Sequence, residues 1–285
     1  MEERPPLLRP RPLQRGDTIG VVASSYAPRS GWLARGVRSL ERAGYGVIVD
    51  PELSTIRRYT RAEDERRAAR FTEMWIDPRI TALIGGTGGY GAVRMLPYLD
   101  PQLFAAHPKS FVGYSDITVL HIWLERLAGL RAFHGPTVDD LIPSARDVTT
   151  ASLLTALTTP RPTARMGRDL ARAVRPGRAT GRLVGGNLAL VQLRATGLLA
   201  KVRGIVFGHL SLDRSEEDEF EDFVLDLVAD LGVPVLMDFP AGHDSPNLTL
   251  PLGTEVELVV EDTTGWIVYR EDALADPSSP PTAAS

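Results

Sequence analysis

The residues with the clearest chemical potential lie between Lys109 and His121, in the segment KSFVGYSDITVLH. An apolar strand leads into Ser115, and a helix follows from Asp116. A serine held between a strand end and a helix start projects from the backbone, and the next amide points at whatever its hydroxyl attacks. Ser115 is therefore a candidate nucleophile. It is equally a candidate N-cap, because serine is a favoured cap and aspartate suits a first helical turn.

The candidate proton acceptor is His243, in the loop PAGHDSPNLTLPLG that follows an apolar strand. An isolated loop histidine is also common in structural or solvated positions, so its type alone does not assign a role. His121 lies on the apolar helix ITVLHIWL and is predicted to be a core or interface residue. His134 ends another strand, and we expect it behind the residues that do chemistry.

A glycine-rich loop, GGTGGYG from Gly85 to Gly91, follows a strand and precedes a short helix. Its unobstructed N–H groups can bind a carboxylate, a phosphate or an oxyanion, and its glycines also suit a tight turn with positive φ. The match to G-x-G-x-x-G lies at the third strand-to-helix turn. The acidic residue expected about 20 positions later is not found, since Asp100 is too near and Asp116 marginal. Nucleotide binding therefore ranks last among the functions considered.

Composition excludes several classes of protein. The 285 residues carry a net charge of −4, and the arginines are dispersed between acids, so we predict no nucleic-acid partner. The absence of cysteine rules out disulfides and thiol chemistry, and the five scattered histidines argue against a catalytic metal. We see no signal peptide and no membrane-spanning run, so we expect a cytoplasmic protein without a membrane partner.

The elements around these residues alternate between short β-branched strands and amphipathic helices from Gly16 to about Pro143. This pattern predicts βαβ units with a parallel sheet, in which ligands gather at the carboxyl ends of strands. Three strand ends carry unusual residues: Ser24-Ser25, the glycine loop and Ser115. These strand ends are the positions where a ligand of such a sheet would gather.

The predicted fold class is α/β, with an N-terminal parallel-sheet domain at 13–143 and a smaller, β-rich α/β domain at 175–272. The intervening 144–174 is polar and reads as a linker with one helix near Ala151 to Leu157. Another helix is expected from about Leu188 to Leu199. Residues 1–12 and 273–285 are predicted to be flexible tails, because their composition offers little apolar surface to bury.

Five motifs in order carry a resemblance to a known family: IGGTGGYGAVRMLPYLD, FVGYSDITVLH, GRLVGGNLAL, GIVFGHL and PAGHDSPNLTLPLG. They resemble the LD-carboxypeptidase family, serine peptidases that include muramoyltetrapeptide carboxypeptidase and microcin-immunity peptidases. The similarity covers most of residues 13–260. It implies Ser115 as nucleophile, His243 as its histidine, and an oxyanion hole from the amides of Asp116 and Gly89. It implies no cofactor and no metal.

The chain departs from this family after GGNL. Relatives continue through a further helix and a strand ending in an L-E-D-x-x-E type segment, whose glutamate supports the histidine. Here GGNLALV runs directly into QLRATGLLAKVRGIVFG, and no residue matches that glutamate. Asp213, Glu216 and Glu217 are the nearest chemical substitutes, although a solvated loop and helix start is the favoured interpretation of that stretch.

The leading hypothesis is thus a cytoplasmic LD-carboxypeptidase-like serine hydrolase in peptidoglycan recycling. It would remove a terminal D-amino acid from murein-derived tetrapeptides. The alternatives are a catalytically impaired homologue that binds muropeptide-like ligands and a microcin-immunity-type peptidase. The expected partner is a small peptide, and a homodimer is open.

Overall fold

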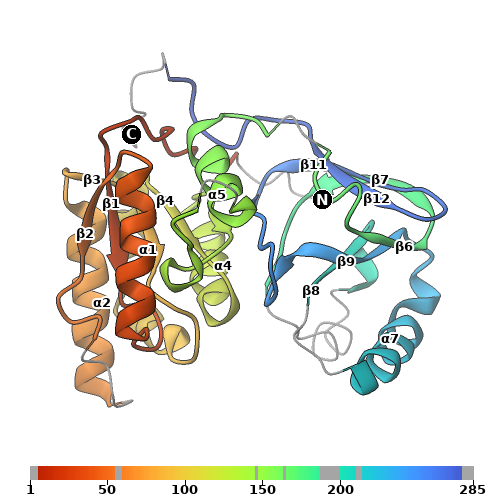
Figure 1. The fold of residues 1–285 in the computed structure, drawn as a ribbon, viewed down its shortest axis with the longest axis horizontal. Helices are drawn as coiled ribbons and strands as arrows, with labels where there is room; N and C mark the ends of the chain where they lie inside the picture. The colour runs from red at the N-terminus through yellow and green to blue at the C-terminus, as the bar shows by residue number, and fades with distance from the viewer. Residues whose placement is uncertain are drawn as a thin grey trace.

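The computed structural model describes residues 6–54, 60–144, 147–162, 165–186, 199–209 and 214–277. It has two halves, one built on a large mainly parallel sheet and the other on two small sheets (Figure 1). This arrangement confirms the predicted α/β class with a second, β-rich part.

The large sheet has the strand order β10-β5-β4-β3-β1-β2. The five strands from the N-terminal half are parallel, whereas β10 runs antiparallel to β5. The strands are β1 (Thr18–Val22), β2 (Gly46–Val49), β3 (Ile80–Gly85), β4 (Ser110–Gly113), β5 (Phe133–His134) and β10 (Leu250–Pro251). The helices of this half are α1 (Ser30–Arg42), α2 (Arg61–Ile76), η1 (Ala92–Tyr98), α3 (Pro101–Ala106), η2 (Ser115–Ile117), α4 (Thr118–Arg126), η3 (Val138–Asp140) and α5 (Val148–Thr158), where η denotes a 3₁₀ helix.

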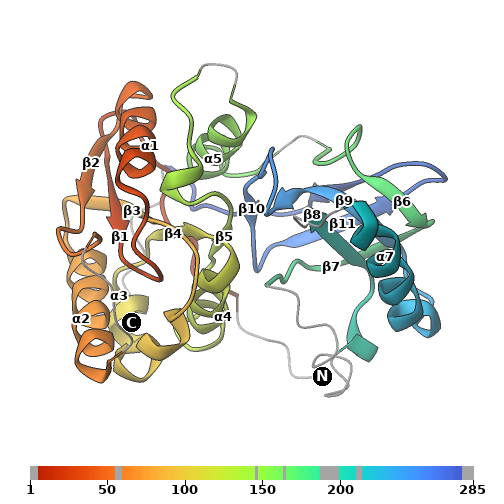
Figure 2. The same cartoon turned by 60° about the horizontal axis from the view of Figure 1, so that its bottom comes forward.

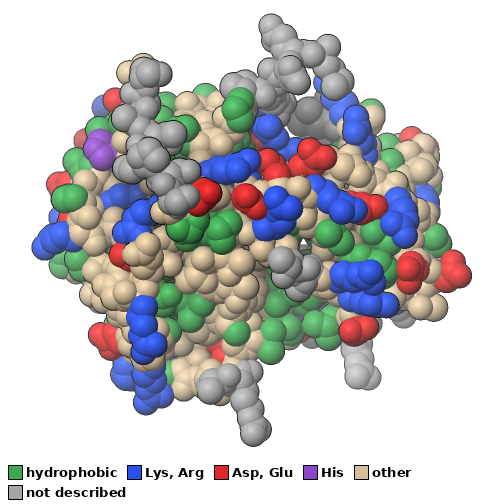
Figure 3. Space-filling model, turned by 90° about the horizontal axis from the view of Figure 1, so that it is seen from above, with side chains coloured by type: hydrophobic (Ala, Val, Ile, Leu, Met, Phe, Trp, Pro, Cys, Tyr) green, Lys and Arg blue, Asp and Glu red, His purple; other side chains and the backbone are tan. Residues whose placement is uncertain are grey.

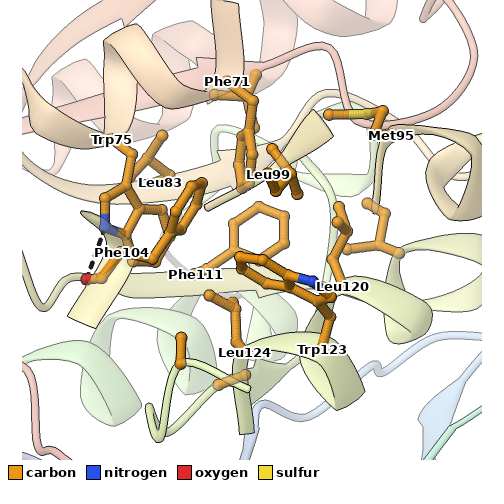
Figure 4. Packing of buried hydrophobic residues seen from close by; sticks show 14 of the residues in the cluster. Phe71, Trp75, Leu83, Met95, Leu99, Phe104, Phe111, Leu120, Trp123 and Leu124 are labelled. Carbon is orange, nitrogen blue, oxygen red and sulfur yellow. Dashed lines mark hydrogen bonds between the residues drawn. The ribbon is translucent and has the colours of Figure 1, made fainter. Parts of the chain in front are cut away.

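Alternation along the strands sends apolar side chains to both faces of this sheet, which explains its near-continuous hydrophobic runs. On one face, α2, α3 and α4 pack an aromatic cluster around Phe111 of β4 (Figure 4). Its rings include Phe71, Trp75 and Phe104, and the Trp75 indole donates a hydrogen bond to the Phe104 carbonyl. On the other face, α1 and α5 cover Val112 and its neighbours. The result is a three-layered α/β/α unit.

The second half packs two three-stranded sheets together, β12-β11-β7 and β6-β9-β8. Helix α7 covers the outer face of the latter and is visible beside β8 in Figure 2. The elements are β6 (Arg172–Arg175), β7 (Gly177–Arg182), η4 (Leu199–Lys201), β8 (Ile205–His209), α7 (Arg214–Val228), η5 (Ala229–Leu231), β9 (Val235–Gly242), β11 (Glu255–Val260) and β12 (Gly265–Tyr269).

Three parts of the predicted organisation differ from the structure. The 144–174 segment is not a loose linker, because α5 buries Leu153 and Leu157 against the large sheet. Strand β10, expected within the second domain, completes the edge of the first sheet beside β5. Both predicted tails are too long. Leu7, in the N-terminal tail, is buried, and Ala273 and Leu274, in the C-terminal tail, join the core beside α5. In each case the predictions differ from the structure because a short apolar segment lies within a polar stretch of the sequence.

The helix expected from Leu188 to Leu199 falls mainly outside the described residues. Within the described chain no helix has the length and apolarity needed to cross a membrane, and no group of three or more His, Asp or Glu side chains is arranged to hold a metal. On the face shown in Figure 3, Lys and Arg side chains alternate with Asp and Glu. Ion pairs in the second half include Arg172–Glu221, and the buried Arg131 pairs with Glu271.

The buried His121 should make the stability of the core depend on pH. It is 1% exposed, its ring meets Phe111 edge-on, and burial together with nearby His134 lowers its pKa from 6.5 to about 3. The unfolded chain therefore takes up this proton at higher pH than the folded protein does. We expect the free energy of unfolding to fall as pH drops from about 6.5 towards 3.

Replacing the imidazole with an apolar side chain, His121→Leu, should reduce the change in the free energy of unfolding over this pH range. Urea unfolding at a series of pH values would measure it. An unchanged slope in the variant would show that His121 does not govern this acid sensitivity.

Candidate active site

Ser115 occupies a strained turn at the carboxyl end of β4. Its φ is 57°, a left-handed conformation that costs a non-glycine residue of order 1 kcal/mol and is found mainly at functional positions. The turn is crowded, since a Cβ at Gly113 would lie 2.7 Å from Ile117 and one at Gly88 would lie 3.3 Å from the Ser115 Cβ. Thr118 secures the turn by donating a hydrogen bond to the Ser115 carbonyl at 2.7 Å. Tyr114, rather than Ser115, holds the N-cap position of η2.

His243 follows directly after the carboxyl end of β9. Strand β9 contains an irregularity at Asp238, where φ is 54° and the register with β8 shifts. Such bulges redirect the residues that follow them. At the strand end the His243 amide donates to the His209 carbonyl of β8 at 3.0 Å. A Cβ on Gly242 would lie 2.5 Å from that carbonyl oxygen, so only glycine permits this approach.

The two candidate residues meet between the halves of the molecule. The His243 Nε2 atom lies 3.1 Å from the Ser115 Oγ atom. This is hydrogen-bonding distance for a hydroxyl and the base that would accept its proton. His243 is exposed and Ser115 half-buried, so the pair is open to a ligand. An arrangement of this kind can perform nucleophilic acyl transfer.

Tyr114 packs against the histidine. Its ring lies 5.2 Å from the His243 ring in an edge-on arrangement, and its hydroxyl donates to the Asp140 carboxylate at 3.3 Å. Burial and the adjacent Asp140 and Asp139 carboxylates raise the Tyr114 pKa. Burial also raises the pKa of Asp140, which accepts hydrogen bonds from Thr137.

His134 lies behind Tyr114, with its ring 6.2 Å from the tyrosine ring. Burial, assisted by the nearby His243, lowers the His134 pKa to about 4, so this imidazole is neutral near pH 7. The structure thus places His134 where a supporting residue was expected. The contacts of Tyr114, Asp140 and the His209 carbonyl with the site were not predicted. Only the Gly-His dipeptides at the ends of β8 and β9 could have indicated these contacts from the sequence.

The three unusual strand ends come together in the structure. Ser25 donates to the Asp116 carboxylate at 2.7 Å, and the amide of Tyr26 donates to the Gly88 carbonyl at 3.2 Å. The Asp116 and Gly89 amides therefore belong to neighbouring segments around Ser115. Gly89 has a φ of 126°, a conformation that favours glycine.

The candidate acids are only partly described. Asp213 lies outside the described residues. Glu216 and Glu217 fall in the first turn of α7, but their side chains are likewise outside the description. The backbone places this helix start after β8, whose last residue His209 pairs with Gly242 next to His243.

Comparisons with known proteins agree with this geometry. Residues 19–135 match the LD-carboxypeptidase N-terminal domain, and residues 187–258 match the LD-carboxypeptidase C-terminal domain. A relative from Streptomyces coelicolor, named "Putative carboxypeptidase SCO6489", is 31% identical, with 95% of this chain and 99% of that protein covered. This chain belongs to the LD-carboxypeptidase family.

Two further proteins are similar to this chain, one in sequence and one in fold. The "Probable murein peptide carboxypeptidase" of Bacillus subtilis is 28% identical, with 91% of this chain and 94% of the relative covered. A solved structure of MccF in complex with glutamyl sulfamoyl guanosine has the same fold, with a TM-score of 0.81 and 22% identity over 94% of this chain and 100% of that one. The family predicted from the five motifs is confirmed.

The comparison with the Streptomyces relative also shows a difference in length within the aligned region. The match to the Streptomyces protein extends over 312 aligned positions, more than the 285 residues of this chain. The relative therefore contains positions for which this chain has no residue. That agrees with the missing segment inferred after GGNL.

Gly242 provides a test of how His243 is positioned. Gly242→Ala should push the strand end away from the His209 carbonyl, and a misplacement of about 1 Å can cost about 100-fold in rate. The matched control is Gly232→Ala, where φ is also positive (62°) but a Cβ would meet nothing within 4 Å.

Gly232→Ala carries the cost of a left-handed residue, about 1 kcal/mol. Gly242 has a φ of 128°, outside that region, so its substitution costs more, and thermal unfolding must show that the variant is folded before labelling is compared. Only Gly242→Ala should lose reactivity of Ser115 towards a fluorophosphonate probe. Equal labelling of the two variants would contradict positioning of His243 through this contact.

Proposed function

We propose that this protein is a serine-type LD-carboxypeptidase that releases the terminal D-amino acid from a murein-derived tetrapeptide. The observation that carries the proposal is the 3.1 Å approach of His243 Nε2 to Ser115 Oγ. Membership of a carboxypeptidase family and the strained conformation of Ser115 support it. The bacterial relative named as a murein peptide carboxypeptidase supports the substrate class.

The proposed reaction begins when Ser115 attacks the carbonyl carbon of the terminal peptide bond while His243 accepts the hydroxyl proton. The Asp116 and Gly89 amides would bind the oxygen anion that forms. His243 then returns the proton to the leaving amine of the D-amino acid, which breaks the C–N bond. Water, activated by the same imidazole, hydrolyses the acyl-enzyme and frees Ser115.

Tyr114 would limit the orientations of the His243 ring during these steps. In a Ser-His-acid triad the acid normally fixes the histidine tautomer and stabilises the imidazolium. The glutamate that the family resemblance implies has no match in this sequence, so an edge-on aromatic contact is a useful restraint. It supplies orientation and about 1 kcal/mol at most, rather than the charge of a carboxylate.

A microcin-immunity-type peptidase is the second candidate. It is favoured by the fold shared with MccF, a protein solved with glutamyl sulfamoyl guanosine. A homologue that binds muropeptides without turnover is the third. Parallel assays with a tetrapeptide ending in D-Ala and with an acidic aminoacyl sulfamoyl nucleoside would separate the first two.

Ser115→Ala should abolish hydrolysis and fluorophosphonate labelling while leaving the fold intact. The hydroxyl makes its described side-chain contact only with His243, so its removal should change the free energy of unfolding by about 1 kcal/mol or less. Release of D-Ala measures activity, and thermal unfolding checks the fold. D-Ala release that survives this substitution would exclude Ser115 as the nucleophile.

We expect weak turnover, because the family glutamate has no match in this sequence and replacing the acid of such a triad costs about 10⁴ in rate in a well-characterised protease. A rate comparable to that of a full-length relative would require a substitute acid. Alanine substitutions at Asp213, Glu216 and Glu217, assayed singly for D-Ala release, would then identify it. Glu219→Ala, one turn further along α7, serves as the control for general charge loss.

A further inference from the structure

The Asp116 side chain makes contacts that the proposed reaction does not use. One carboxylate oxygen, Oδ2, accepts a hydrogen bond from Ser25 Oγ at 2.7 Å and from the Ala92 amide at 2.8 Å. Ser25 follows β1, and Ala92 follows the glycine loop. A single half-buried atom next to the nucleophile thus connects all three strand ends.

The glycine loop needs such a connection. It contains five glycines between residues 85 and 91, and glycine gives the backbone more freedom than any other residue. Its Gly89 amide must nevertheless stay fixed relative to the Asp116 amide if both are to bind one oxygen. The two amides come from separate segments of chain, and Ala92 lies only three residues beyond Gly89.

Arg67 of α2 also binds this junction. It is 2% exposed and donates to the Gly91 carbonyl at 3.1 Å and to the Ser24 and Ser25 carbonyls at 3.4 Å each. Asp64 balances its charge at 2.9 Å and also pairs with Arg94. The loop and the segments beside it are therefore held by the Asp116 carboxylate and the Arg67 guanidinium.

We infer that Asp116 is a positioning residue whose carboxylate sets the oxyanion-binding Gly89 amide of the glycine loop against Ser115. This inference rests on the proposed function, in which those amides act. Because Oδ2 is only an acceptor in both contacts, its hydrogen-bonding geometry rather than its charge carries the role. Asparagine can present one oxygen in the same place.

The kinetic test compares Asp116→Ala with Asp116→Asn. We expect the alanine variant to lose about 100-fold in kcat for D-Ala release, with KM changed by less than about threefold. The asparagine variant should recover most of that loss. Ser25→Ala, which removes only one of the two hydrogen bonds, should fall between them.

A purely structural role would give a different result. Asp100 also accepts a helix N-terminal amide, from Gln102 at 2.9 Å, but it does so at α3. Asp100→Ala is therefore a control for the stability cost of losing such a cap. If Asp116→Ala behaves like this control, with lower stability but wild-type kcat, the inference is overturned. Equal damage in Asp116→Ala and Asp116→Asn would overturn it too.

Hydrogen exchange tests the same inference without turnover. In Asp116→Ala the amides of residues 86–92 should exchange faster than in wild type, whereas Asp116→Asn should resemble wild type. Unchanged exchange in Asp116→Ala would refute the connection. If wild type neither releases D-Ala nor reacts with a fluorophosphonate, the proposed function fails, and the exchange comparison still decides whether Asp116 orders the loop.

Discussion

The hydrogen bond between Ser115 and His243 joins two residues 128 positions apart, and the rest of the molecule serves to keep them together. One residue ends a strand of the large sheet, and the other follows a strand of a small one. Neither sheet alone contains a site. The distance between Ser115 and His243 therefore depends on the contacts that join the two halves.

Residues 247–254 supply much of that joining. The Asn247 amide donates to Thr149 and the Thr249 amide to Ser152, both on α5. The next residues form β10 on the edge of the large sheet, and the Leu252 amide then donates to the Ala132 carbonyl. This segment begins four residues after His243. The loop that carries the histidine is thus anchored on the half of the molecule that carries the serine.

The sequence predicts the parts of this structure that local periodicity and motif order control. The βαβ alternation and the gathering of a ligand at the strand ends follow from apolar patterning and from the rule for parallel sheets. The α5 packing, β10 and the buried Ala273 could not be predicted in this way, because each is a short apolar piece whose partner is distant. The Tyr114–His243 contact depends on how the halves are oriented, which no local pattern encodes. The family motifs singled out Ser115 and His243 without indicating what holds them.

Strand β10 also constrains the order in which the chain can fold during synthesis. Strand β5 has its antiparallel neighbour at Leu250–Pro251, more than 100 residues later than Phe133–His134. At translation rates of about 5–20 residues per second, that neighbour emerges from the ribosome about 5–20 s after β5. Until then the nascent large sheet exposes an unpaired edge, the feature through which strands of separate chains associate. The N-terminal half therefore cannot reach its final state before nearly the whole polypeptide has been made.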